Sequence, residues 1–234
     1  AYILPYIEQG GLFNGMDIRK YNVLAPNAAA TATPIKVFTC PSDGAFGRIG
    51  GNGARSNYNI SSGSGYLCTI DYLNSSNYTS GALDNGGAFY PYRGRSILQF
   101  RDGTSTTALL AEVLAGKHDG GSIGTEDFRG LWNVYQHSAS SYSHQLTPNS
   151  TTGDHMYQGG SSTEVRCRNE LPDLPCDATA PNQHEVYVAA RSKHTGGVNV
   201  VFADGHVQFV TNSVNAQTWK DIATVAGNEV VGEY

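Results

Sequence analysis

The chain has 234 residues, of which only 15% are charged, and it contains 28 Gly and 14 Tyr. This length allows one large domain, and low charge with many small polar residues is typical of secreted, loop-rich β proteins rather than cytosolic helical enzymes. The net charge of −5 is small, which argues against nucleic-acid binding. No apolar run approaches the roughly 20 residues that span a bilayer.

The first part of the chain predicts a helix and then a strand. Within residues 1–20 one helical face is apolar, and Gly10-Gly11 is expected to end that helix. Ile35–Thr39 is typical of a short strand that leads into Cys40-Pro41. The apolar residues on the predicted helical face are Tyr2, Ile3, Tyr6 and Ile7.

The middle of the chain is mostly irregular. Residues 44–87 and 115–185 are rich in Gly, Ser and Asn, and we expect them to form long surface loops. Between them, Ser96 predicts an N-cap for a short helix that runs through Gln99. Thr106–Glu112 then predicts a central strand.

The strongest local signal is a β-hairpin near the C-terminus. Apolar residues alternate before and after Asp204-Gly205, the dipeptide favoured in a two-residue type I′ turn. Such a turn would pair Phe202 with Val207 and Val200 with Phe209, and all four would face the core. A final helix is predicted over Ala216–Ala226, with Ser213 or Asn215 as its N-cap.

Four cysteines predict two disulfides. Their spacing matches no zinc finger, and an even number in a chain of secreted composition favours bridges. Local pairing, Cys40 with Cys68 and Cys167 with Cys176, is the simplest of three connectivities, and free buried thiols are the alternative. We expect a bridge that closes the second loop to contribute about 2–3 kcal/mol.

Histidine and carboxylate residues near the hairpin form a small group that would suit catalysis or metal binding. It would combine Glu112, His194, Asp204 and His206. A role for Asp204 as a turn residue is the favoured explanation, and no metal-binding spacing such as His-Glu-x-x-His is present, so we assign no catalytic and no metal-ligating residue. A calcium ion in one of the Asp-containing loops is the alternative that stays open.

A resemblance to a known family rests on motifs spread over most of the chain. Nine residues separate His194 from Asp204-Gly205, and this segment contains Gly196-Gly197 and Asn199. This pattern resembles the prepilin-type H-X9-DG family of bacterial surface proteins, which are similar to type IV pilins and pseudopilins. Further blocks match in order: Leu4–Gln9, Cys40–Asp43, Ser56–Tyr58, Asp102–Ser105 running to Glu112, Trp219, and Gly227–Val231.

The resemblance implies a single pilin-like α+β domain over residues 1–234. In this fold an N-terminal helix packs on an antiparallel β-sheet, with long irregular loops and, from the cysteines, two disulfides. The hydrophobic N-terminal helix of the family has no counterpart ahead of Ala1, so we expect it to be missing or truncated. The implied role is a non-enzymatic subunit that self-associates into an extracellular pilus- or pseudopilus-like filament or other cell-surface assembly, and that reaches the membrane only through the missing helix.

Two other functions compete with this one. Tyr-rich loops and Trp132 would suit an extracellular module that binds carbohydrate or a metal ion, and Glu112, His194 and Asp204 would suit a secreted hydrolase. Surface glycosylation is a further expectation. The Asn-x-Ser/Thr triplets begin at Asn59, Asn74, Asn77 and Asn149.

Overall fold

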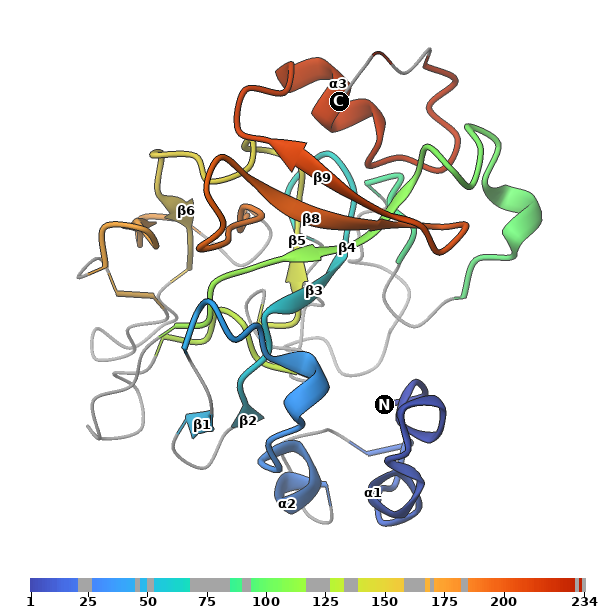
Figure 1. Cartoon of the computed structure of the whole chain (residues 1–234), viewed down its shortest axis with the longest axis vertical. Helices are drawn as coiled ribbons and strands as arrows, with labels where there is room; N and C mark the ends of the chain where they lie inside the picture. Colours follow the sequence, from blue (N-terminus) through green and yellow to red (C-terminus); the bar gives the residue numbers. More distant parts are fainter. Residues whose placement is uncertain are drawn as a thin grey trace.

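A five-stranded sheet with the strand order β5-β3-β4-β8-β9 lies at the centre of the fold (Figure 1). Neighbouring strands are antiparallel, except that β3 and β5 are parallel. The strands are β3 (Tyr58–Ser61), β4 (Ala108–Glu112), β5 (Ser141–Tyr142), β8 (Gly197–Phe202) and β9 (Val207–Thr211). The computed structural model describes residues 1–20, 27–44, 47–49, 53–67, 85–89, 94–116, 127–132, 139–157, 167–168, 171–181, 185–229 and 232.

Two small sheets and several short helices surround this sheet. The small sheets pair β1 (Arg48–Ile49) with β2 (Gly53–Ala54), and β6 (Asp154–His155) with β7 (Cys176–Asp177). The α-helices are α1 (Gly10–Asn14), α2 (Ala28–Thr31) and α3 (Ala216–Asp221), and the 3₁₀ helices are η1 (Leu4–Ile7), η2 (Lys36–Phe38) and η3 (Ile97–Gln99). Within the described ranges, none of these helices is long and apolar enough to cross a membrane.

Three predicted elements are confirmed. β4 is the middle strand of the sheet, and Ser96 caps η3 in a capping box with Gln99. Asn215 is the N-cap of α3, because its side-chain oxygen accepts hydrogen bonds from the backbone N–H groups of the first turn. The final helix ends at Asp221, five residues earlier than predicted.

The hairpin forms, but its turn differs from the predicted one. The Phe202 N–H donates to the His206 carbonyl (3.0 Å), and the Gly205 N–H donates to the Phe202 carbonyl (2.9 Å). The loop therefore has three residues, Ala203 to Gly205, and only Gly205 has a positive φ (91°). This pattern is the three-residue loop with a glycine bulge rather than a two-residue type I′ turn.

The additional loop residue shifts the pairing of the two strands by one position. Val201 faces Val207, and Asn199 faces Phe209. Because side chains alternate across a strand, this shift places Val207 and Phe209 on the outer face, where they are 61% and 42% exposed. The prediction that both are buried is wrong. Val198, Val200, Phe202 and Val210 are buried as the inner face.

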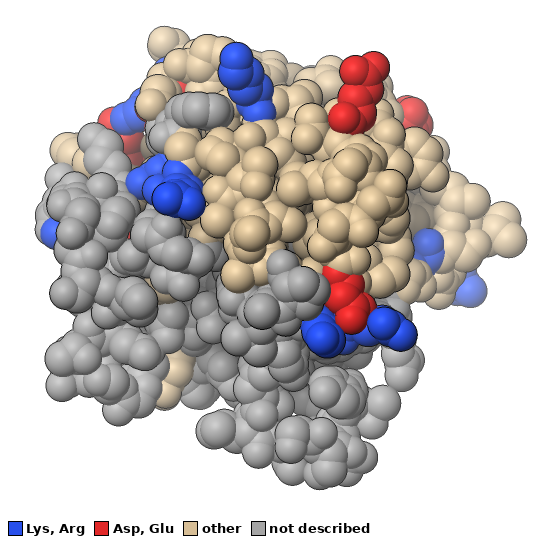
Figure 2. Space-filling view, turned by 90° about the horizontal axis from the view of Figure 1, so that it is seen from below, with Lys and Arg blue, Asp and Glu red and all other residues tan. Residues whose placement is uncertain are grey.

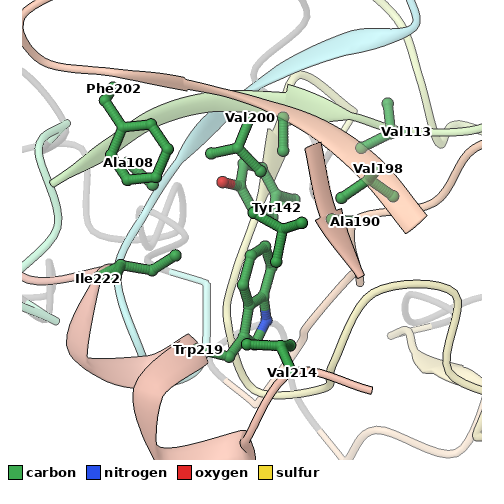
Figure 3. Close-up of a cluster of buried hydrophobic side chains, with 12 residues drawn as sticks. Ala108, Val113, Tyr142, Ala190, Val198, Val200, Phe202, Val214, Trp219 and Ile222 are labelled. Carbon is green, nitrogen blue, oxygen red and sulfur yellow. The ribbon is translucent and has the colours of Figure 1, made fainter. Parts of the chain in front are cut away.

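The main core lies between the inner face of the hairpin and α3 (Figure 3). Trp219 and Ile222 point from α3 toward Val200 and Phe202, and both are fully buried. The Trp219 indole N–H donates to the Leu146 carbonyl (2.8 Å), which satisfies its single polar group. The short helix α3 therefore covers the inner face that the N-terminal helix was expected to cover.

The N-terminal segment does not pack on the sheet, and this part of the predicted pilin-like fold class is wrong. η1 ends where Glu8 adopts a left-handed φ of 60°, and Gly10 begins α1 instead of ending a helix. Leu4 packs in a separate apolar cluster with Ile35, Ala54 and Trp132. The segment Ile35–Thr39 is also not a strand, because its centre forms η2.

The disulfide prediction is half right. Cys167 and Cys176 form the predicted local bridge, with their Cα atoms 6.0 Å apart. Cys40 is a buried free thiol, so the predicted bridge from Cys40 to Cys68 is wrong. Cys68 itself lies outside the described residues. The predicted α+β fold with two disulfides is thus corrected to a mixed sheet with short helices and one disulfide in the described part of the chain.

A buried network of charges joins the loops beside the sheet. Arg129 forms ion pairs with Asp127 (2.6 Å) and Asp154 (2.8 Å), and Arg191 pairs with Asp154 (2.9 Å). Burial alone would lower the pKa of Arg129, but the two carboxylates raise it well above its usual value. The carboxylate of Asp154 is thus shared between two arginines.

His144 is fully buried and stacks on Trp219. Its Nδ1 lies 2.6 Å from the Trp219 carbonyl oxygen, and its Nε2 lies 3.0 Å from the Tyr142 hydroxyl. A carbonyl only accepts, so Nδ1 carries the proton and Nε2 accepts from the hydroxyl. Burial, partly offset by the bond to the Trp219 carbonyl, lowers the pKa of His144 to about 3.

The positive φ of Gly205 in the hairpin loop leads to a testable prediction. Open space surrounds Gly205, so Gly205→Ala isolates the cost of a positive φ, which we expect to reduce the free energy of unfolding by about 1–2 kcal/mol. Urea denaturation followed by circular dichroism measures this change. Gly10→Ala, which also adds a Cβ in open space, is the control and should cause no loss. Equal stability of the two variants would contradict the assignment of the loop.

Burial of neutral His144 predicts loss of stability in mild acid. The folded state disfavours protonation, whereas the unfolded chain takes up a proton below about pH 6.5. The stability that neutral His144 provides is therefore present above pH 6.5 and is lost as the pH falls, by about 2 kcal/mol between pH 7 and pH 5. His144→Gln should remove that part of the pH dependence, whereas His206→Gln should keep it. Unfolding curves at the two pH values test this difference.

Candidate functional site

Three of the sequence motifs meet at one end of the strand pair β4–β8. Cys40 follows η2, Glu112 is the last residue of β4, and His194 precedes β8. These residues are far apart in the sequence, yet the sulfur, carboxylate and ring-nitrogen atoms of their side chains all lie within 4.8 Å of one another. We call this group the Cys–Glu–His cluster.

The geometry of the cluster centres on one ring nitrogen. His194 Nε2 lies 3.0 Å from Glu112 Oε1 and 3.7 Å from Cys40 Sγ. Cys40 and Glu112 are buried, whereas the side chain of His194 is 34% exposed. The cluster is therefore enclosed by the protein on the side of Cys40 and Glu112 and open to solvent at His194.

The second carboxylate oxygen of Glu112 is held by β8. Asn199 donates to Glu112 Oε2 from its backbone N–H (2.7 Å) and from its side-chain amide (3.2 Å). The Glu112 carbonyl also accepts from the Arg191 N–H (2.8 Å). These bonds fix the orientation of the carboxylate, so that Oε1 faces His194.

Asn57 holds the Cys40 side of the cluster. Its side-chain oxygen accepts from the Cys40 N–H (2.8 Å). Its amide group donates to Asp43 Oδ2 (2.7 Å) and to the Val113 carbonyl (2.9 Å). Asn57 is buried. Through these hydrogen bonds its side chain joins the Cys40–Asp43 block, the Ser56–Tyr58 block and the end of β4.

Tyr58 lies beside the cluster at the solvent side. It pairs with Glu112 across β3 and β4, and its side chain contacts Cys40. Burial, and then the electrostatic influence of the neighbouring Cys40 and Glu112, raise the pKa of Tyr58. The phenol therefore stays protonated and is a hydrogen-bond donor at neutral pH.

The cluster does not have the geometry of a nucleophile relay. In a relay, one nitrogen of the imidazole faces the nucleophile and the other faces the carboxylate. Here both Cys40 Sγ and Glu112 Oε1 lie nearest the same nitrogen of His194. Three unlike donor atoms within 4.8 Å of one another instead have a spacing compatible with a metal ion.

The structure separates the histidine and carboxylate residues that the sequence grouped near the hairpin. Glu112 and His194 are brought together, but Asp204 and His206 lie at the other end of β8, where His206 Nδ1 is 2.6 Å from Asp204 Oδ1. Cys40 was missed as a member of the cluster because it was assigned to a disulfide. Its motif, like those of Glu112 and His194, was visible in the sequence, but nothing in the sequence placed the three together.

The two glycines of the motif have backbone roles. Gly196 has a φ of 88°, which favours glycine. A Cβ on Gly197 would lie 2.2 Å from the Val210 carbonyl oxygen, so any side chain there would push β9 away from β8. Both residues therefore shape the turn between His194 and β8.

A further motif ties the C-terminal segment to the sheet. The Asp102 carboxylate accepts from the backbone N–H groups of Gly227 (2.6 Å) and Asn228 (2.9 Å). The Thr104 carbonyl accepts from the Asp204 N–H (3.0 Å), so the same block also contacts the hairpin loop. The Asp102–Ser105 and Gly227–Val231 blocks thus have a structural role in their described residues.

The predicted glycosylation and stacking residues have different environments. Asn59 is buried in β3, and its amide donates to the Ala139 carbonyl (3.2 Å), whereas Asn149 bonds to Asn212 (2.8 Å) on the surface. Asn74 and Asn77 lie outside the described residues. Trp132 is buried, and its indole N–H donates to the Thr33 carbonyl, so it is not exposed for stacking on a sugar.

The comparisons identify the family. A family model described as "Protein of unknown function (DUF1559)" matches residues 1–217, and the chain belongs to this family. It is a family of bacterial surface proteins that often have a pilin-like N-terminus. No curated protein and no solved structure matches the chain.

The hydrogen bonds of Asn57 beside the Cys–Glu–His cluster lead to a prediction about stability. Asn57→Ala would leave the buried Cys40 N–H and Val113 carbonyl without partners, and we expect a loss of about 3 kcal/mol in the free energy of unfolding. Asn14→Ala, at an exposed position, is the control and should change stability by less than about 0.5 kcal/mol. Denaturant unfolding measures both variants. A small effect at Asn57 would show that it does not join the motifs.

Proposed function

We propose that this protein is the globular part of a surface-assembly subunit that associates head to tail with copies of itself. The order and spacing of the motifs, which resemble the H-X9-DG pilin-like proteins, support this proposal. Membership of the DUF1559 family agrees with a surface role. The finer assignment to a pilus- or pseudopilus-like filament outside the cell rests on this resemblance.

The observation that carries the proposal is the apolar outer face of the hairpin. β9 is an edge strand, and it presents Val207 and Phe209 outward beside half-buried Val201. Edge strands that avoid association usually carry Lys, Pro or a bulge. The segment Val207–Thr211 contains neither Lys nor Pro, and its pairing with β8 is regular.

A second exposed apolar group lies near the N-terminus. Tyr2, Ile3 and Tyr6 are exposed, Tyr6 by 87%, while Leu4 between them anchors the segment. Figure 1 places the N-terminus and β9 toward opposite ends of the long axis of the molecule. Seen from below, the described surface carries only scattered charges (Figure 2).

Two different apolar groups at opposite ends favour an open chain of subunits. A contact between unlike surfaces does not close on itself unless the rotation between subunits permits a ring, whereas a contact between like surfaces stops at a dimer. The partner that fits the outer face of β9 is therefore the N-terminal segment of another copy. Both groups lack charged side chains, so their contact leaves no charge buried without a partner.

The head-to-tail arrangement predicts a specific result when variants are mixed. Val207→Lys with Phe209→Lys should block one end, and Tyr2→Lys with Tyr6→Lys the other. Each double variant should weaken association by about 3 kcal/mol or more, over roughly 100-fold, because it removes two apolar contacts. The wild type should form oligomers larger than a dimer, each double variant should be monomeric, and their equimolar mixture should stop at dimers. Sedimentation velocity measures these species.

Leu98→Lys is the matched control, because Leu98 is 87% exposed on η3, outside both groups. This variant should assemble like the wild type. A monomeric wild type at high concentration would contradict the proposed function, as would larger oligomers from either double variant alone. A mixture that stays monomeric would contradict the head-to-tail arrangement.

A further inference from the structure

We propose that the Cys–Glu–His cluster is a binding site for a Zn²⁺-type transition metal ion, held by Cys40 Sγ, Glu112 Oε1 and His194 Nε2. This inference is independent of the proposed assembly function. It rests on the position of three unlike donor atoms from three separate segments of the chain.

The two donor spacings that involve His194 Nε2 are close to those expected around a tetrahedral ion. With usual zinc–ligand distances of about 2.3 Å to sulfur and about 2.0–2.1 Å to nitrogen and oxygen, tetrahedral angles place the sulfur about 3.5 Å and the oxygen about 3.4 Å from the nitrogen. The corresponding distances here are 3.7 Å from Cys40 Sγ and 3.0 Å from Glu112 Oε1 to His194 Nε2. Shifts of a few tenths of an ångström would therefore give both pairs the separations expected around a tetrahedral ion.

The chemistry of the donors selects the class of metal. Thiolate and imidazole ligands favour Zn²⁺ and related transition metals, whereas Ca²⁺ and Mg²⁺ require oxygen ligands. One sulfur, one nitrogen and one oxygen therefore exclude a calcium site at this position. Because the ligands must be deprotonated, binding should release protons, including that of the Cys40 thiol.

The residues around the ligands support them as in known metal sites. Metal-binding carboxylates are usually fixed by hydrogen bonds from a second layer of residues. Two donors from Asn199 fix Glu112 Oε2, which leaves Oε1 directed at His194. The hydrogen bond from the Cys40 N–H to Asn57 fixes the backbone at the thiol.

Three protein ligands leave a fourth tetrahedral position. It lies on the side where His194 and Tyr58 reach solvent, since Cys40 and Glu112 are buried. A water molecule would complete the coordination of the ion there, near the Tyr58 phenol, which interacts with Cys40. The ion would then join the end of η2, the end of β4 and the start of β8.

Metal titration of the purified chain tests the proposal. The protein carrying Tyr2→Lys and Tyr6→Lys is treated with a chelator under reducing conditions and titrated with Zn²⁺ and with Co²⁺. Using this variant keeps the measurement separate from assembly, so failure of one proposal does not affect the other. We expect one bound ion per chain, a rise in the melting temperature, and the thiolate-to-cobalt charge-transfer band in the Co²⁺ spectrum.

Single substitutions identify the ligands. Cys40→Ser should abolish the charge-transfer band, and Glu112→Gln and His194→Gln should each weaken binding at least roughly 100-fold. Asn199→Ala, which removes only a positioning hydrogen bond, should weaken it by about 10- to 100-fold with the band retained. His206→Gln changes the exposed histidine beside Asp204 and should bind like its parent. Circular dichroism confirms that each variant is folded.

The outcomes separate cleanly. Absence of saturable binding in the parent protein would overturn the proposal even if some variants fail to fold. A charge-transfer band that persists in Cys40→Ser would also overturn it, because the sulfur would then come from elsewhere. Loss of binding in His206→Gln equal to that in His194→Gln would place the ion at the other end of β8.

Discussion

The arrangement of the Cys–Glu–His cluster depends on the hydrogen bonds of the buried Glu112 carboxylate. One oxygen accepts two hydrogen bonds from Asn199 in β8, and the other faces His194. A buried carboxylate without such partners would cost several kcal/mol. Glu112 therefore stays in the interior only while β8 keeps its present register against β4. The position of His194 and its closeness to Cys40 both follow from that register.

The sequence predicted the elements whose signals are local. A short apolar run located β4, alternating apolar residues located β8 and β9, and the side chains of Ser96 and Asn215 located two helix starts. The hairpin register failed because it depends on loop length, which Asp204-Gly205 alone does not determine. The N-terminal helix failed because its apolar face has no partner on the sheet, where α3 already covers the core.

The candidate site was visible only in pieces. The motifs containing Cys40, Asn57, Glu112 and His194 could each be recognised, but their meeting point depends on contacts between residues 17 to 82 positions apart. The even number of cysteines favoured disulfides. Cys40 was therefore assigned to a bridge and was not considered as a free thiol beside a histidine. The proposed ion and the proposed assembly face share the hairpin, because Asn199, which holds Glu112, pairs with Phe209.

The side of the sheet on which Val207 and Phe209 lie depends on the number of residues between β8 and β9. Deleting His206 would keep the loop from Ala203 to Gly205 but would place Val207 opposite Phe202. β9 would then slide by one residue, turning Val207 and Phe209 inward and Val210 outward. The loss of a single codon between the two strands would thus bury the apolar side chains that we propose to mediate assembly, without altering any residue of either strand.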